Sequence, residues 1–120
     1  MIFVGTDIVP ISRIDKLIKE KGDHFLNHIF SSVEQDICNK KSSPSIHYSG
    51  KFAAKEAVQK AIMSSKTLLT ITHRSIEIHN DKDGMPFVKI KKNGFEFENL
   101  RISISHAGNY ATATAILELK

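Results

Sequence analysis

The strongest helical pattern in this chain is the stretch Ser49-Gly50-Lys51-Phe52-Ala53-Ala54-Lys55-Glu56-Ala57-Val58-Gln59-Lys60-Ala61-Ile62-Met63. Its apolar residues recur at the three- and four-residue spacing of one buried helical stripe: Ala54, Ala57, Val58, Ala61 and Ile62. Alanine favours the helix and leaves room for a neighbouring sheet to approach closely. The pattern assigns the other side of the helix to polar residues, namely Lys55, Glu56, Gln59 and Lys60.

Glu56 is unusual because it is the only carboxylate among six lysines between Lys40 and Lys66. It precedes Lys60 by four residues, so the two side chains are expected one turn apart. One interpretation is a surface ion pair worth about 0.3–0.5 kcal/mol. The other is a functional carboxylate in a basic environment, and two further segments bear on that choice.

The first of these segments is the N-terminal run from Ile2 to Val9, which is apolar apart from Thr6 and Asp7. An uninterrupted apolar run of this length predicts a strand that is buried on both faces. A carboxylate in such a strand is costly unless it is paired, hydrogen-bonded or bound to a metal. Asp7 is therefore either a functional ligand or a residue at the end of the strand that caps the next turn.

Pro10 is expected to end this strand and to begin a helix. The apolar positions of that helix are Ile11, Ile14, Leu17 and Ile18, and its other sides carry the basic residues Arg13, Lys16, Lys19 and Lys21. These basic residues form either a solvated face or a surface that docks an acidic helix.

The remaining segments predict short helices followed by strands. We expect a short helical segment from His24 to Phe30, and a helix from about Val33 to Asn39 that begins with a Ser32/Gln35 capping box. Strands are expected at Thr70–His79, Met85–Ile90, Arg101–Ser105 and Tyr110–Leu117. The order predicts a single α+β domain over residues 1–120, with an antiparallel sheet packed against the long alanine-rich helix.

Composition narrows the possible function classes. The chain has 120 residues, a net charge of +4, one cysteine and no tryptophan. It has no apolar run long enough to span a membrane and no basic start typical of a signal peptide. The lone Cys38 fits a reducing compartment, so we expect a cytoplasmic protein. The charge favours an acidic partner, but nothing here resembles a phosphate-binding glycine loop or a base-stacking nucleic-acid module.

Two histidines, His24 and His28, are four residues apart, as in some metal sites. No third ligand or HExxH motif accompanies them, so we interpret both as structural.

Three stretches together resemble the holo-acyl-carrier-protein synthases, which are small 4'-phosphopantetheinyl transferases. Gly5-Thr6-Asp7-Ile8-Val9 with Arg13-Ile14 is similar to that family's N-terminal motif. Phe52-Ala53-Ala54-Lys55-Glu56-Ala57 with Lys60-Ala61 resembles its central helix. Ser103-Ile104-Ser105-His106 with Tyr110-Ala111 resembles its C-terminal hairpin, and Gly84-Met85-Pro86 matches its G-x-P turn. Order and spacing agree along the whole chain. Lys51 departs from the arginine common in the family, which keeps the charge but loses a bidentate phosphate contact.

The resemblance implies an enzyme of fatty acid biosynthesis. Such an enzyme transfers the phosphopantetheine arm of coenzyme A to a serine of acyl carrier protein and releases adenosine 3',5'-bisphosphate. It also implies Mg2+, with Mn2+ as a substitute, bound at Asp7 and Glu56, because attack on a pyrophosphate calls for a hard cation. The serine proton could pass to Asp7, to Glu56 or to a water held by the metal.

Further roles follow from the same resemblance. Lys60 would stabilise charge or protonate the leaving phosphate, whereas Lys51 and His106 would contact the nucleotide phosphates. Arg13 and Lys16 would face the acidic carrier protein. The family assembles as a homotrimer with sites between subunits, and neither a nucleic acid nor a membrane is expected as a partner.

Two alternative functions belong to other classes of protein. A non-enzymatic basic module that binds RNA or an acidic protein would explain the net charge but not Asp7 or the co-occurrence of the three stretches. A metal-dependent nuclease is the weaker of these alternatives. Loading of a carrier protein from coenzyme A distinguishes these hypotheses.

Overall fold

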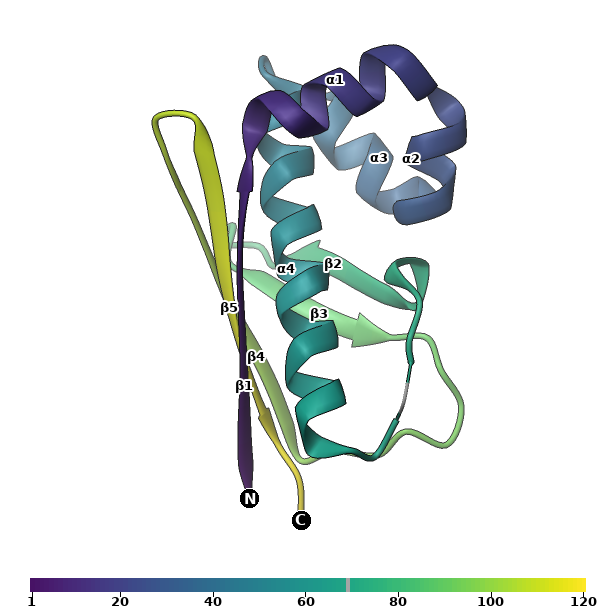
Figure 1. Ribbon diagram of the computed structural model, residues 1–120, viewed down its shortest axis with the longest axis vertical. Coiled ribbons are helices and arrows are strands. Elements are labelled where there is room, and N and C mark those ends of the chain that lie inside the picture. The colour runs from purple at the N-terminus through teal and green to yellow at the C-terminus, as the bar shows by residue number, and fades with distance from the viewer. Residues whose placement is uncertain (69) are drawn as a thin grey trace.

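One long helix, α4, forms the centre of the computed structural model, which describes residues 1–68 and 70–120 (Figure 1). The elements follow in the order β1 (Ile2–Pro10), α1 (Ile11–Lys21), α2 (Asp23–Ile29), α3 (Ser32–Asn39), α4 (Pro44–Ser65), the 3-10 turn η1 (His73–Ser75), β2 (Ile76–Asn80), β3 (Pro86–Ile90), β4 (Asn99–Ala107) and β5 (Tyr110–Glu118). The α+β class and the long alanine-rich helix are confirmed, and the helix begins at Pro44, before the stretch that was quoted from Ser49.

α4 packs against a three-stranded antiparallel sheet with the strand order β1-β5-β4. Alternate residues of β5 are buried on the face toward the helix: Ala111, Ala113, Ala115 and Leu117. The small side chains of this strand therefore form the surface on which Ala54, Ala57 and Ala61 pack.

Gly5 allows β1 to lie almost against the helix backbone. A Cβ atom at this position would stand 1.9 Å from the carbonyl oxygen of Ala57 and 2.7 Å from the amide nitrogen of Ala61. Only glycine permits this approach, and it brings the following residues of β1 alongside the middle of α4.

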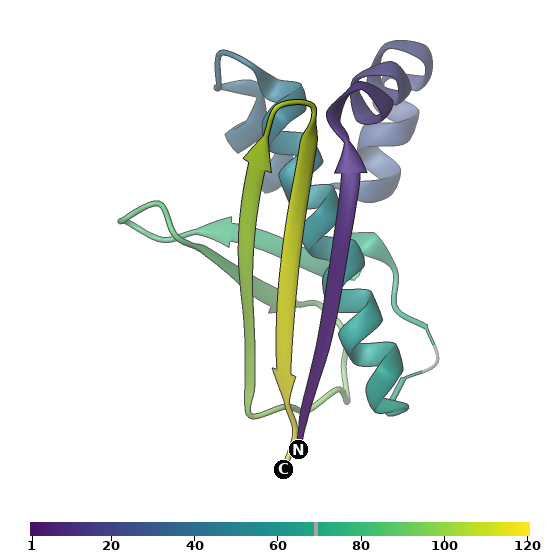
Figure 2. The same cartoon turned by 60° about the vertical axis from the view of Figure 1, so that its left-hand side comes forward.

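β1 is an edge strand of the sheet, and the prediction that it is buried on both faces is wrong within one chain. Its inner face is covered by α4, but Ile2, Val4 and Ile8 are 65%, 58% and 65% exposed. Figure 2 shows the outer face of the sheet uncovered, with α4 behind it. The apolar run thus leaves an exposed apolar surface on the outer face.

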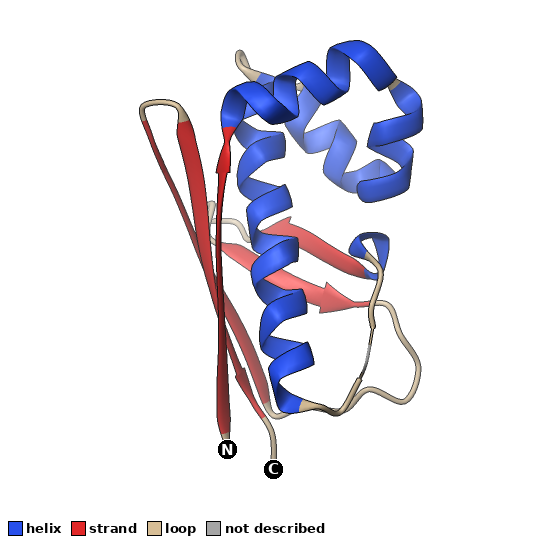
Figure 3. Cartoon of the chain, viewed as in Figure 1, coloured by secondary structure: helices blue, strands red, loops and turns tan. Residues whose placement is uncertain are grey.

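The first three helices gather at the end of the sheet where β1 leads into α1 (Figure 3). A capping box starts α3, but Ser31 and Glu34 form it instead of the predicted Ser32 and Gln35. The amide of Glu34 donates to Ser31 Oγ, and the amide of Ser31 donates to Glu34 Oε1. The predicted segment around His24–Phe30 contributes Leu26, Ile29 and Phe30 to the core.

The β2–β3 hairpin forms a second, two-stranded sheet rather than extending the first. Gly84 adopts a φ of 84° in its turn, as expected for glycine. The strand predicted at Thr70–His79 starts only at Ile76, because residues 73–75 form η1. The hairpin crosses α4, with β2 beside α3, and this arrangement creates the cleft described below (Figure 1).

Candidate active site

Asp7 and Lys60 meet where β1 crosses α4. The Lys60 ammonium donates to the Thr6 carbonyl at 2.9 Å and lies 3.2 Å from Asp7 Oδ1. The Asp7 side chain is 17% exposed. The partner of Lys60 is thus a residue of β1, and the interpretation of Glu56 and Lys60 as a surface ion pair finds no support among the described residues.

Glu56 lies one turn before Lys60 on α4, and its side chain is 30% exposed. Its Oε1 atom lies 3.3 Å from Nε2 of His73 in η1. The ring of His73 stacks on Phe52 with centroids 5.5 Å apart and planes 14° from parallel. His73 was not among the residues expected at the site, because η1 comes after α4 and no periodic pattern in the sequence links the two.

These two carboxylates fit a hard cation. Each uses one oxygen in the contacts above, Oδ1 of Asp7 and Oε1 of Glu56. Mg2+ is bound in proteins by one or two carboxylates together with waters and substrate phosphates. In the described part of the chain, no group of three or more His, Cys, Asp or Glu side chains forms a complete metal cage. A cation held here would therefore take its remaining ligands from substrate and water.

A cleft of about 490 Å³ opens on the opposite flank of α4. It lies between the start of α4, the β2–β3 turn and the end of β4, and its lining residues are Ile37, Lys41, Ile46, His47, Gly50, Lys51, Asn80, Gly84, Pro86, Ile104 and His106. Two residues that the sequence analysis assigned to nucleotide phosphates, Lys51 and His106, thus line one cavity.

Lys51 is only 5% exposed and donates to two atoms of β2, the Ile78 carbonyl at 3.3 Å and Asn80 Oδ1 at 3.2 Å. Burial lowers the pKa of its ammonium. His106 is exposed in β4. Burial, followed by the basic side chains of Lys41, His106 and Lys51 nearby, lowers the pKa of His47. The lining of the cleft is therefore rich in basic groups and suits an anionic ligand.

The carboxylate site and the cleft are separate within one chain. Asp7, Glu56 and Lys60 do not line the cleft. Glu56 follows Lys51 by five positions, which turns their side chains about 140° apart around a helix. β1 and β4 are also the two opposite edges of the sheet. The residues predicted to share one site thus fall into two separate groups within one chain, the carboxylate group (Asp7, Glu56 and Lys60) and the cleft, which are called half-sites below.

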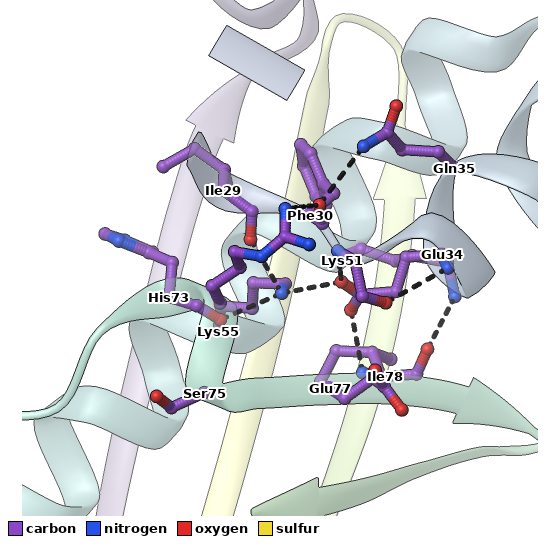
Figure 4. A network of polar contacts seen from close by, with 12 residues as sticks. Ile29, Phe30, Glu34, Gln35, Lys51, Lys55, His73, Ser75, Glu77 and Ile78 are labelled. Carbon is purple, nitrogen blue, oxygen red and sulfur yellow. Dashed lines mark hydrogen bonds and ion pairs between the residues drawn. The ribbon is translucent and has the colours of Figure 1, made fainter. Parts of the chain in front are cut away.

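Between these half-sites lies a buried ion pair, shown in Figure 4. Lys55 was assigned to the polar side of its helix, and this is wrong because its side chain is completely buried and lies 2.8 Å from Glu34 Oε1. Its ammonium also donates to the carbonyls of Ile29 and His73, each at 2.9 Å. Burial lowers the pKa of Lys55, while the charge of Glu34 opposes that shift.

The predicted docking residues Arg13 and Lys16 are both exposed on α1. Lys16 is 74% exposed and lies 3.9 Å from Glu20, one turn further along the helix. An ion pair so open to solvent adds little stability, so this face is free to meet a partner.

Two other expectations concern residues outside these sites. His24 and His28 are exposed. None of the helices in residues 1–68 and 70–120 has the length and apolar character needed to cross a membrane.

Comparison with known proteins gives matches over almost the entire chain. The family model described as the 4'-phosphopantetheinyl transferase superfamily matches residues 3–115. The holo-[acyl-carrier-protein] synthase of Protochlamydia amoebophila is 42% identical over 116 residues, which cover 94% of both chains. That of Thermodesulfovibrio yellowstonii is 41% identical over 114 residues, covering 95% of this chain and 96% of its own.

Two similar solved structures contain coenzyme A according to their descriptions. The Chronobacterium ammoniagenes ACPS–CoA complex has a TM-score of 0.86 and 27% identity, with 100% of this chain and 98% of the other covered. The Helicobacter pylori holo-[acyl-carrier-protein] synthase in complex with coenzyme A has a TM-score of 0.84 and 30% identity, with 96% and 99% covered.

Proposed function

This chain belongs to the 4'-phosphopantetheinyl transferase superfamily, and on that premise we propose that it loads acyl carrier protein. The reaction moves the 4'-phosphopantetheine group of coenzyme A to a serine hydroxyl of the carrier and releases adenosine 3',5'-bisphosphate. The observation that carries the proposal is the similarity along nearly the whole chain to holo-[acyl-carrier-protein] synthases. Its place in metabolism would be fatty acid biosynthesis in the cytoplasm.

Asp7 and Glu56 are the proposed ligands of Mg2+, with Mn2+ as a substitute. Their half-buried carboxylates lie on adjacent elements and use one oxygen each in the contacts described. When bound, the cation would neutralise charge that spreads over the pyrophosphate during transfer. Lys60, held beside Asp7, supplies a further positive charge at the same place and can offer a proton to the leaving phosphate.

The cleft on the other flank of α4 is the proposed nucleotide site. His106 is exposed there and free to contact a phosphate oxygen. Lys51 is not proposed to contact a phosphate directly, because its ammonium already donates to the Ile78 carbonyl and to Asn80 Oδ1. Its role is to add positive potential to the cleft and to hold the lining residue Asn80 in place.

As the family resemblance implies, the working enzyme is proposed to be a homotrimer, and the two half-sites are compatible with neighbouring subunits that complete each other. In a cyclic assembly one face of a subunit meets a different face of the next. Ile2, Val4 and Ile8 leave an exposed apolar surface on the outer face of β1, and apolar surface of this kind marks an interaction site. In our proposal the carboxylates come from one subunit and His106 from its neighbour.

Each subunit is proposed to act as a single catalytic domain spanning residues 1–120. Its docking surface for the carrier is α1, where Arg13 and Lys16 would meet acidic residues. Nucleic acid and membrane have no part in this proposal.

The test is intact-mass measurement of an apo acyl carrier protein after incubation with the purified chain, coenzyme A and Mg2+. The carrier should gain the mass of one phosphopantetheine group, and adenosine 3',5'-bisphosphate should appear in equal amount. A carrier in which the acceptor serine is replaced by alanine is the control. If the carrier keeps its mass while a known synthase loads it under the same conditions, the proposal fails, and a non-enzymatic basic module becomes the better hypothesis.

A further inference from the structure

We propose that His73 is a positioning residue that holds the carboxylate of Glu56 in the orientation needed to bind the cation. This inference rests on the proposed function, because it assumes that Glu56 is a metal ligand. His73 would not touch the substrate or the cation. It would act through Glu56 alone.

The geometry around Glu56 supports this role. Nε2 of His73 lies 3.3 Å from Oε1 of Glu56, so one carboxylate oxygen is occupied. The contact is a hydrogen bond when the ring carries its proton on Nε2, because an ionised carboxylate only accepts. Oε2 has no hydrogen-bond partner among the described residues and remains available to a cation. Metal-binding carboxylates are commonly hydrogen-bonded in this way through groups that do not touch the metal.

Contacts of its ring and of its backbone hold His73 in place. Its ring stacks on Phe52, which lies one turn before Glu56 on the same helix. The backbone of His73 is fixed by its carbonyl, which accepts a hydrogen bond from the buried Lys55 ammonium at 2.9 Å. In Figure 4 this carbonyl faces Lys55, and the imidazole points away from the buried network.

The buried ion pair therefore has a consequence for the site. Lys55 is anchored by Glu34, whose own Oε2 accepts from the Ile78 amide of β2 at 2.8 Å. η1 is also closed by Thr72, which accepts from the Ser75 amide at 3.3 Å. A rigid chain of contacts thus runs from the core to His73 and ends at Glu56.

Holding Glu56 in one orientation should strengthen cation binding. A free glutamate must give up side-chain freedom when it binds a metal, whereas a held one has already lost part of it. Removing such an outer contact typically weakens metal affinity by about 10- to 100-fold. We therefore expect His73→Phe to raise the dissociation constant for Mn2+ by about tenfold. Phenylalanine keeps an aromatic ring that can stack on Phe52, but it lacks both ring nitrogens of histidine.

The chain offers a matched control in His79. This residue also contacts a glutamate, Glu77, and stacks on a phenylalanine, Phe87, with centroids 5.4 Å apart. It lies on β2 and outside both half-sites. His79→Phe should leave Mn2+ binding unchanged, and His73→Gln, which restores a donor, should recover part of the lost affinity.

The experiment is titration of Mn2+ into the protein with coenzyme A present and carrier absent, so that no turnover occurs. Free Mn2+ is read by electron paramagnetic resonance, and the melting temperature of each variant is measured in parallel. The inference predicts weaker Mn2+ binding by His73→Phe at an unchanged melting temperature. Equal affinities for wild type and His73→Phe would overturn this inference alone. If the wild type binds no Mn2+, both the metal assignment and the inference are wrong.

Discussion

At the scale of single residues, the proposed function depends most on Asp7 and Glu56. Their neighbours differ, since Asp7 lies beside Lys60 and Glu56 beside His73. A cation bound by both carboxylates would add a second, stronger neutralising charge to that of Lys60. Both charges should therefore be needed, and neither residue should substitute for the other.

We predict that Asp7→Asn or Glu56→Gln reduces turnover at least about 100-fold, because charge neutralisation in phosphoryl transfer is worth several kcal/mol. The measurement is the initial rate of carrier loading at saturating coenzyme A. EDTA should abolish loading by the wild type, and excess Mg2+ should restore it. Full activity in EDTA would show that the carboxylates have another role.

Single residues also show where sequence reasoning reached its limit. Asp7 was recognisable because a carboxylate in an apolar strand is costly. Lys55 was not, since helical periodicity assigned it to the polar side, and its partner Glu34 is 21 residues away in the sequence. Only the tertiary arrangement of α3, α4 and η1 places that pair in the core. His73 was missed for the same reason.

At the scale of elements, α1 is the proposed docking helix. Arg13→Glu should raise the Michaelis constant for the carrier far more than that for coenzyme A, because opposite charges steer and hold the two proteins. Added salt should do the same to the wild type. The measurement is steady-state loading with each substrate varied in turn.

The control for this prediction is Lys92→Glu, an equal charge change on an exposed residue of the loop after β3. It should affect both Michaelis constants little. If Arg13→Glu changes the Michaelis constants for the carrier and for coenzyme A equally, the docking hypothesis is wrong. The basic residues of α1 then form a solvated face, which is the alternative interpretation.

Most elements were predictable because their patterns are local. Residue spacing and turn residues were enough to predict three features: the change from strand to helix at Pro10, the alanine-rich helix and the β2–β3 hairpin. The capping box was shifted by one residue, because Ser31 and Ser32 are equally suited by type and only the contact with Glu34 distinguishes them. The sequence of β1 did not show which of its two faces α4 covers, because the residues on the exposed face are apolar as well.

At the scale of the whole molecule, the separation of the half-sites is the main observation. The carboxylates lie on the β1 side of α4, and the cleft lies on the β4 side. The family resemblance implies a site between subunits, with the carboxylates from one subunit and His106 from the next. The separation within one chain is compatible with such a shared site, which predicts that defects on opposite sides of the interface complement each other.

The most direct measurement mixes two inactive proteins. Asp7→Ala and His106→Ala should each be nearly inactive alone. After unfolding and refolding together in equal amounts, about a quarter of the interfaces should pair an intact Asp7 with an intact His106, because each half is intact half the time in a heterologous contact. Loading activity should rise toward a quarter of that of wild type refolded in parallel. If a tag shows that subunits have mixed and the activity stays at the level of the parents, both residues serve a site within one chain.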